Sequence, residues 1–431
     1  MSYWRSPKIL AWALYDWANS AFATTVMAGF FPVFFKQYWA SGLAASESTF
    51  WLGVANAFAS VCVVLMAPLI GAIADQGGVR KRFLLFFTAM GIVMTGGLFL
   101  VAQGFWALAV ALYIVAIIGF SGSLVFYDSL LFDVTDERGF DFVSALGFAA
   151  GYLGGGLLFA INVLMTLYPQ SFGLVDAAEA VRVSFLSVAL WWGLFSIPVL
   201  LLVREHDGHP GQGGQGWGEM VGGGVRRLRA TFAQVRRLRH TFLFLLAYWC
   251  YIDGVDTIVR MAVDYGLSLG FEANGLMVAL LITQFVGFPA ALGFGVLGRR
   301  WGPRPGILLA IGVYLLVILW AYRMQSQWEF YLLAVAIGLV QGGIQALSRS
   351  LYARLIPRNQ SGEFFGFFNM MAKFAAVLGP LLMGVVSLIA GSPRLSILSV
   401  ALLFVAGALL LYRVDPREGA AQARALERGG V

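Results

Sequence analysis

Charged residues are what this sequence has least of. Only 12% of its 431 residues are Asp, Glu, Lys or Arg, whereas about a quarter is usual in soluble globular domains. Apolar residues make up 60% of the chain. This composition excludes an ordinary soluble globular fold, and it predicts a protein whose surface faces lipid.

Histidine and cysteine are also scarce, with three His and two Cys. The histidines lie between apolar runs, which excludes a histidine proton relay at membrane depth. Cys62 and Cys250 are isolated from each other in separate runs, where a thiol behaves as a small apolar group. We therefore expect neither a disulfide nor a bound metal or other cofactor. A membrane enzyme would need a nucleophile and base at membrane depth, so we expect no enzyme.

Long apolar runs dominate what is present. A helix needs about 20 apolar residues to cross a bilayer, and twelve such runs recur along the chain. They lie at 9–36, 49–74, 83–103, 105–131, 143–167, 180–203, 241–266, 272–297, 306–323, 328–352, 362–390 and 393–413. The first run is too long for a cleavable signal peptide and lacks a cleavage site. We therefore predict an all-α polytopic membrane protein with twelve transmembrane helices.

The basic residues predict the orientation of these helices. The formal net charge is +7, and most Lys and Arg lie at the N-terminus, in the even-numbered loops and in the C-terminal tail. On the opposite side lie only Lys36, Arg182, Arg323 and Arg394. This asymmetry follows the positive-inside rule and predicts that both termini are cytoplasmic. The cations are expected to face anionic membrane lipids rather than nucleic acid.

A glycine-rich turn occurs twice and indicates an internal repeat. Gly71, Asp75, Gly78 and Arg80 follow the second run, and the same frame returns at Gly295, Arg299, Gly302 and Arg304 after the eighth. Asp16 likewise corresponds to Asp253, and Asp128 to Arg349. We predict two pseudo-symmetric six-helix bundles, at 1–203 and 241–413, with a C-terminal tail at 414–431. The linker at 204–240 begins Gly-rich and continues as a basic amphipathic helix on the membrane surface.

Polar residues within the apolar runs are the candidate functional residues, because an intramembrane charge is costly. The candidates for solute binding or proton coupling are Asp16, Asn19, Asp128, Asp253, Asp256, Arg260, Gln341, Gln345, Arg349 and Lys373. Structural alternatives stay open. Asp16 and Asn19 could simply hold helices together. Arg260 could pair with Asp256 one turn away. Lys373 could pair with an aspartate of the first or the seventh predicted helix.

The repeated turn itself is a candidate gate. We expect its residues, Gly71, Asp75, Gly78 and Arg80 with Gly295, Arg299, Gly302 and Arg304, to form the cytoplasmic gate. Asp75 with Arg80 would act as a charge latch between the two halves. Because Arg299 replaces the acid in the second half, a latch there cannot have the same chemistry.

The twelve runs, the repeat and the Gly-x-x-x-Asp-x-x-Gly-x-Arg turn resemble the major facilitator superfamily. Five segments are similar to the autophagy-associated vacuolar amino-acid effluxers and their bacterial "unknown major facilitator" relatives. These segments are YDWANSAF (15–22), GYLGG (151–155), DG (253–254), QALSRS (345–350) and GEFFGF (362–367). The resemblance implies the major facilitator fold and alternating access. It also implies a cavity lined by the first, fourth, seventh and tenth predicted transmembrane helices.

From these observations we predict a secondary active or facilitative transporter of a small polar or zwitterionic solute, such as an amino acid, with possible proton coupling. No ATP-binding loop Gly-x-x-x-x-Gly-Lys-Ser/Thr is present, so flux must be driven by an ion gradient or by diffusion. The expected location is the bacterial cytoplasmic membrane, and the expected unit is a monomer. An exporter of lipids or amphipathic compounds and a non-transporting sensor are the alternatives.

Overall fold

The computed structural model describes residues 6–77, 79–205, 233–268, 273–390 and 393–428. The side chain of Arg260 and residue Gly78 fall outside the described set, as does most of the predicted amphipathic helix in the linker. Every regular element among the described residues is helical. Eleven described helices are long and apolar enough to cross a membrane, and α14 (Ser361–Ala390) covers the one remaining predicted run, 362–390.

The first half contains six long helical segments. The first begins as α1 (Pro7–Ala21) and continues through a π-helix (Phe22–Phe30), α2 (Phe31–Phe34) and a second π-helix (Phe35–Trp39). The others are α3 (Ala45–Gly77), α4 (Arg80–Gly97), α5 (Trp106–Ser129), α7 (Phe140–Leu167) and α8 (Ala177–Leu202), with α6 (Leu131–Val134) as a short connection.

The second half repeats this plan. Its long helices are α10 (Arg239–Ser268), α11 (Ala273–Trp301), α12 (Pro303–Arg323), α13 (Gln327–Leu355), α14 (Ser361–Ala390) and α15 (Pro393–Tyr412). Local sequence sets several starts: Ser326 and Glu329 form a capping box before α13, and Asp176 accepts a hydrogen bond from the Glu179 N–H at the start of α8. The predicted C-terminal tail contains a further helix, α16 (Pro416–Arg428).

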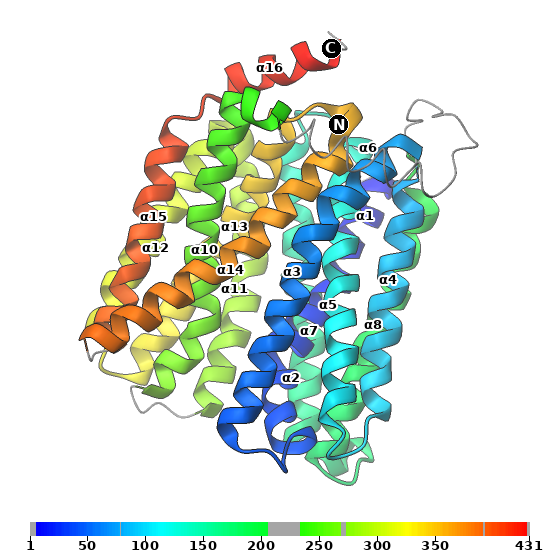
Figure 1. Ribbon diagram of the computed structural model, residues 1–431, viewed down its shortest axis with the longest axis vertical. Coiled ribbons are helices and arrows are strands. Elements are labelled where there is room, and N and C mark those ends of the chain that lie inside the picture. Colours follow the sequence, from blue (N-terminus) through cyan, green and yellow to red (C-terminus); the bar gives the residue numbers. More distant parts are fainter. Residues whose placement is uncertain (1–5, 78, 206–232, 269–272, 391–392, 429–431) are drawn as a thin grey trace.

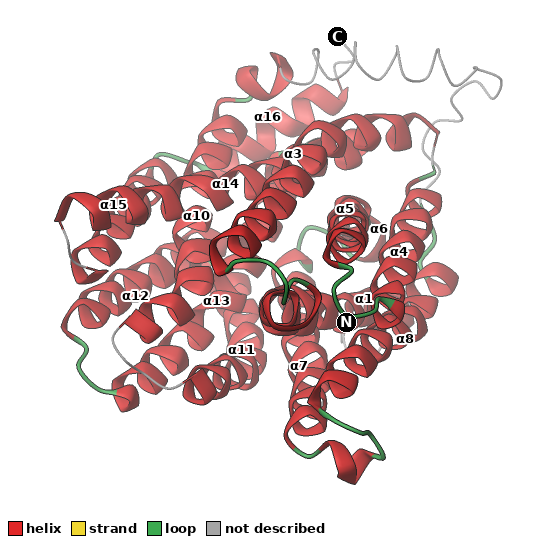
Figure 2. Cartoon of the chain, turned by 60° about the horizontal axis from the view of Figure 1, so that its bottom comes forward, coloured by secondary structure: helices red, strands yellow, loops and turns green. Residues whose placement is uncertain are grey.

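Two bundles stand next to each other in Figure 1, α1–α8 in one and α10–α15 in the other. Both chain termini lie at the same end, which we call the terminal end, and α16 crosses it. The view in Figure 2 shows the helices closer to end-on. Across the boundary between the halves, α11 packs on α7, and α14 packs on α3 and α5.

Glycines allow the closest approach at this boundary. A Cβ at Gly71 of α3 would overlap the backbone carbonyl of Gly362 in α14, and one at Gly366 would lie 2.6 Å from the Ala67 carbonyl oxygen. On the other side, a Cβ at Gly295 of α11 would lie 2.6 Å from the Ala145 Cβ of α7. Small residues in membrane helices permit such backbone contact, so the two halves are held tightly together at these positions.

Candidate functional site

Arg349 of α13 reaches across the boundary into the first half. Its Nε donates to Ser144 Oγ and its Nη2 to the Ser144 carbonyl, both at 2.9 Å. Its Nη1 donates to Asp128 Oδ1 at 3.0 Å, and both terminal nitrogens lie 3.4 Å from Asp16 Oδ2. The structure therefore brings together three predicted site residues from three helices. We call Asp16, Asp128, Arg349 and Ser144 the inter-half cluster.

Both carboxylates of the inter-half cluster are buried, and each has one more donor. Asp16 and Asp128 are each 6% exposed. The Tyr127 hydroxyl donates to Asp16 Oδ2 at 2.8 Å, and Asn369 Nδ2 of α14 donates to Asp128 Oδ2 at 3.1 Å. Asn369 and Tyr127 are thus functional candidates that the sequence analysis missed.

Aromatic rings enclose the guanidinium of Arg349. It lies 4.3 Å from the ring centroid of Phe148, 4.7 Å from Trp12 and 5.4 Å from Tyr127, within the range of cation–π attraction. Gly147 leaves the room for this arrangement, since a Cβ there would lie 2.6 Å from Asp16 Oδ2. With water excluded, the ion pairs act through a low local dielectric. Arg349 was a candidate for binding a solute carboxylate, but its nitrogens are engaged by protein groups in this state.

A second ion pair closes the boundary nearer the terminal end. Asp141 at the start of α7 accepts from Arg354 Nη2 at 2.8 Å and from Ser350 Oγ at 2.6 Å, both of α13. Asp141 is 2% exposed. Neither Asp141 nor Arg354 was predicted. The available signal was the repeat, in which Arg354 follows Arg349 at the same spacing as Asp133 follows Asp128.

The first gate turn contacts the start of α14 rather than forming a closed Asp75–Arg80 pair. Asp75 Oδ1 and Oδ2 accept from the backbone N–H groups of Gly362 and Glu363, at 3.1 and 2.9 Å. A carboxylate at a helix N-terminus is favoured by unpaired N–H groups and the helix dipole. Arg80 donates to Ser361 Oγ at 3.0 Å and pairs with Asp133 at 2.9 Å. Asp75 and Arg80 therefore both link the halves, through partners that sequence alone did not indicate.

The second gate turn is only partly at the boundary. Arg299 lies over the Phe142 ring of α7, at 5.9 Å from its centroid, and Gly295 packs on the same helix. Gly302 has φ +87°, which only glycine adopts readily, and it precedes α12. Arg304 donates to the Tyr412 carbonyl and stacks on the Tyr412 ring, at the end of α15. These contacts of Arg304 lie within the second half, and its role in the gate stays a prediction.

Two of the predicted site residues, Asp253 and Asp256, lie on α10. Asp253 is fully buried, and its Oδ1 accepts from the Gly379 N–H of α14 at 3.0 Å and from Thr257 Oγ1 at 3.4 Å. It joins α10 to α14, whereas Asp16 contacts Arg349 of α13. Asp256 is half-buried and interacts electrostatically with Tyr152 of α7, across the boundary.

Two further polar contacts, made by Tyr152 and by Gln284, cross the boundary. The Tyr152 ring packs against Gly287 of α11 and Gly342 of α13, and its hydroxyl donates to Gln345 Oε1 at 3.4 Å. Gln284 of α11 donates to Thr24 Oγ1 of the first π-helix at 2.6 Å. Gln341 and Lys373 are half-buried, and Asn19 is 2% exposed. Tyr152, Thr24 and Gln284 are further candidates that sequence reasoning missed.

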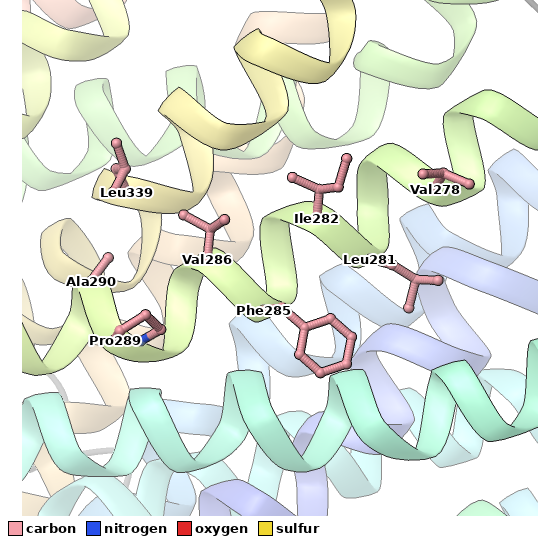
Figure 3. Close-up of a pocket in the computed structure, with 8 residues that line it drawn as sticks. All are labelled: Val278, Leu281, Ile282, Phe285, Val286, Pro289, Ala290 and Leu339. Carbon is pink, nitrogen blue, oxygen red and sulfur yellow. The ribbon is translucent and has the colours of Figure 1, made fainter.

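An apolar groove runs along α11 and is separate from these polar groups. Figure 3 shows its lining residues, which are apolar throughout and come from α11 except for one α13 residue. They are Val278, Leu281, Ile282, Phe285, Val286, Pro289, Ala290 and Leu339. Several are well exposed, including Val278 and Leu339, as expected for a helix surface against acyl chains. The groove has no group that would orient a polar solute.

Comparison with known proteins agrees with this architecture. The family model described as "Vacuole effluxer Atg22 like" matches residues 46–138 and 133–424. The chain is 39% identical to the "Uncharacterized MFS-type transporter YxiO" of Bacillus subtilis, over 93% of both chains. It is 24% identical to "Autophagy-related protein 22" of Coccidioides immitis, over 97% of this chain and 89% of that protein.

Solved structures share the fold at low sequence identity. The human organic anion transporter MFSD10 superposes with a TM-score of 0.71 at 15% identity, covering 94% of this chain and 99% of that one. FucP in the outward conformation gives 0.72 at 13% identity, covering 96% and 100%. These matches confirm the predicted all-α polytopic fold. The chain belongs to the Atg22-like vacuole effluxer family and is a transporter of the major facilitator superfamily.

Proposed function

We propose that this transporter moves a small polar or zwitterionic solute, such as an amino acid or a related metabolite, across the bacterial cytoplasmic membrane by alternating access. Both termini would be cytoplasmic, as the distribution of Lys and Arg indicates. The terminal end is then the cytoplasmic end. On this proposal the structure is the state that is closed toward the cytoplasm.

The observation that carries the proposal is the inter-half cluster. A buried ion pair adds little net stability, because desolvation offsets the Coulomb attraction. Placed between two bundles, however, it can hold one arrangement until the halves separate and water replaces the protein partners. Arg349, Arg354 and the α14 N-terminus all contribute such contacts from the second half. Their location at one end suits a reversible cytoplasmic closure.

The solute class rests on the polar residues farther from that end. Asp256 provides an acid for a solute amine, and Lys373 provides a cation for a solute carboxylate. Tyr152 and Gln345 add hydroxyl and amide groups at the boundary. Lys373 and Arg349 were both candidates for the solute carboxylate, and Arg349 is engaged by the first half in this structure. Asp253 is assigned to positioning α14 against α10.

A ligand screen followed by flux measurements tests this proposal. Purified protein would be screened for thermal stabilisation by amino acids and related metabolites, and hits would be assayed for uptake into proteoliposomes at two pH values. We expect Asp256→Asn and Lys373→Met to abolish uptake, while Lys36→Met, at an exposed cation, leaves it unchanged. Uptake that survives both Asp256→Asn and Lys373→Met would refute the solute site.

An amphipathic solute is the second candidate. A further apolar cavity lies within the second half, between α10, α11, α12, α13 and α15, and its few polar lining groups include Thr283 and Gln341. Such a lining would suit an apolar tail with one polar group. Stabilisation by amphipathic compounds, combined with none by amino acids, would favour this class over the first.

A further inference from the structure

The acceptors described for the Arg349 guanidinium all lie in the first half, although Arg349 belongs to α13 of the second half. Its nitrogens form five hydrogen bonds: one to the Ser144 hydroxyl, one to the Ser144 carbonyl, one to Asp128 Oδ1 and two to Asp16 Oδ2. A guanidinium on an alkyl chain has five N–H donors. The first half therefore supplies as many contacts as this group has donors, and the second half supplies the group.

Three rings of the first half surround the same guanidinium. The ring centroids of Phe148, Trp12 and Tyr127 lie 4.3, 4.7 and 5.4 Å from its Cζ atom. Trp12 and Tyr127 are fully buried. Proteins bind organic cations within such sets of aromatic rings, because the ring faces carry negative potential. We call these three rings, together with Asp16, Asp128 and Ser144, the first-half cage.

Contacts within the first half hold the first-half cage in shape. The Trp12 ring stacks on the Tyr127 ring at 4.5 Å between centroids, and Trp12 Nε1 donates to the Tyr127 carbonyl at 3.0 Å. The Tyr127 hydroxyl donates to Asp16 Oδ2 at 2.8 Å. Gly147 leaves room for the guanidinium, since a Cβ there would lie 3.0 Å from Arg349 Nη2. The stacking and both hydrogen bonds are made without Arg349, so the cage can keep its shape around a different guanidinium.

The first-half cage suits a guanidinium better than other polar groups. Its acceptors come from three helices, α1, α5 and α7, and a planar fork of donors can reach them all at once. An ammonium has three donors on a single nitrogen and cannot span them. A neutral urea has nearly the same planar shape, but it lacks the charge, and its oxygen would face the acceptors. The cage is therefore selective for both the charge and the shape of a guanidinium.

We propose that the first-half cage is a binding site for a free guanidinium compound, such as the amino acid arginine, and that Arg349 occupies this site in the closed state. A free compound enters when the second half moves away and takes Arg349 with it. Because Arg349 and the compound compete for one site, the compound favours the separated halves. That this compound is also the transported solute rests on the proposed function, whereas its binding in the cage does not.

Ethylguanidinium is the first probe, because it has the atoms that Arg349→Ala removes beyond Cβ. We expect ethylguanidinium chloride to raise the melting temperature of the Arg349→Ala variant in detergent. Ethylammonium and neutral ethylurea should have this effect only at concentrations at least about tenfold higher, since each leaves charged hydrogen bonds of the cage unmade. This rescue requires no movement of the halves, so it tests the site independently of transport.

Further substitutions in the Arg349→Ala background locate the bound ethylguanidinium. Asp128→Asn removes a charge from the first-half cage and should raise the half-maximal concentration at least about tenfold. Phe148→Leu removes one ring of the cage and should raise it about tenfold. The matched control is Phe86→Leu, at a ring of α4 that is 60% exposed, and it should leave the half-maximal concentration unchanged.

In the wild-type cage, binding is tested through the separation of the halves. Spin labels at Arg138→Cys and Asn359→Cys report this separation by electron paramagnetic resonance, from dipolar broadening at short range and pulsed methods at long range. Both positions are exposed and lie on opposite sides of the boundary at the terminal end. Cys62 and Cys250 would be replaced by Ala.

We expect L-arginine to lengthen the inter-label distance, because it can occupy the first-half cage only after Arg349 has left. L-Citrulline is the matched control, since it has the same chain with a neutral urea in place of the guanidinium. It should leave the distance unchanged. L-Lysine, which has an ammonium, should act only at a concentration at least about tenfold above that of L-arginine.

Three results would overturn the proposal. They are equal stabilisation of Arg349→Ala by ethylguanidinium and ethylurea, equal effects of Phe148→Leu and Phe86→Leu on that stabilisation, and the same inter-label distance with L-arginine as with L-citrulline. If Arg349→Ala does not fold, the third result decides alone. A chain that passes these tests but does not carry L-arginine into proteoliposomes would refute arginine as the transported solute and leave the binding site standing.

Discussion

Arg349 shows what a single side chain does at the boundary between the halves. Its guanidinium contacts two aspartates, a serine hydroxyl and a backbone carbonyl, and it packs against three rings. A lysine has three donors on one nitrogen and cannot reproduce this planar set. Charge alone is therefore not sufficient at this position.

Removing Arg349 should destabilise the closed state. Arg349→Gln leaves two buried carboxylates without a cation, and breaking a buried pair in this way costs about 3–5 kcal/mol. We expect a lower melting temperature for Arg349→Gln than for the wild type. The melting temperature of Arg349→Lys should lie between those two. Thermal unfolding in detergent measures this. The double variant Asp128→Asn/Arg349→Gln should recover part of the loss, and equal melting temperatures for the single and double variants would contradict the assigned pairing.

At the scale of helices, much of the structure could be predicted from sequence. The apolar runs gave the helices to within a few residues, because crossing a bilayer fixes their length and hydrophobicity. The π-helices in the first segment were not predicted, since the amphipathicity of Phe22–Phe30 is like that of the preceding α-helix. The partners of the buried polar side chains could not be predicted from the sequence either. Asp16 meeting Arg349, while Asp253 meets the Gly379 N–H, depends on how each helix is rotated about its axis.

The contact between α3 and α14 gives a prediction for helix packing. A Cβ at Gly71 would overlap the Gly362 carbonyl, so Gly71→Ala must push α14 away and weaken the Asp75 contacts with its N-terminus. We expect a lower melting temperature in thermal unfolding. Gly53→Ala in the same helix is the matched control, because nothing lies within 4 Å of that position. It should be neutral or slightly stabilising, since Ala favours helix over Gly by about 1 kcal/mol.

The docking of α16 on α10 is predicted to depend on pH. Asp415 Oδ1 accepts from the N–H groups of Arg417 and Glu418, at 2.8 and 3.2 Å, and these bonds lower the pKa of Asp415. His240 Nε2 contacts Glu418 at 2.9 Å and anchors the helix to α10. Because the pKa of Asp415 is lower in the docked state, ionised Asp415 stabilises the docked helix fully above the ordinary carboxyl pKa of about 3.9. It is lost as the pH falls through the docked-state pKa.

Hydrogen exchange of the α16 amides at several acidic pH values would measure this effect, after correction for the intrinsic exchange rate. Protection should fall as Asp415 becomes protonated. Asp415→Asn keeps an acceptor for the cap but has no charge to lose. Its protection should therefore depend less on pH than that of the wild type. The same pH dependence in both proteins would assign the effect to another group.

For the whole molecule, the repeat carries charges of opposite sign at three pairs of corresponding positions. Asp75, Asp128 and Asp133 in the first half correspond to Arg299, Arg349 and Arg354 in the second. A pseudo-symmetric pair of halves with the same charges would place like charges across the boundary. Opposite charges instead make the two faces complementary, as Arg349 with Asp128 and Arg354 with Asp141 illustrate.

This complementarity predicts the result of exchanging charges. Arg354→Asp would place a carboxylate against Asp141 across the boundary, and like charges at an interface cost several kcal/mol. We expect the closed population to fall at least about tenfold, measured as the distance between labels at Arg138→Cys and Asn359→Cys. The double variant Asp141→Arg/Arg354→Asp restores opposite charges and should recover part of the closed population. Recovery is expected to be partial, because Ser350 also donates to Asp141 and Arg299 lies over the adjacent Phe142. If the double variant were as open as Arg354→Asp alone, closure would depend on the fit of the helices rather than on the sign of the charges that face each other.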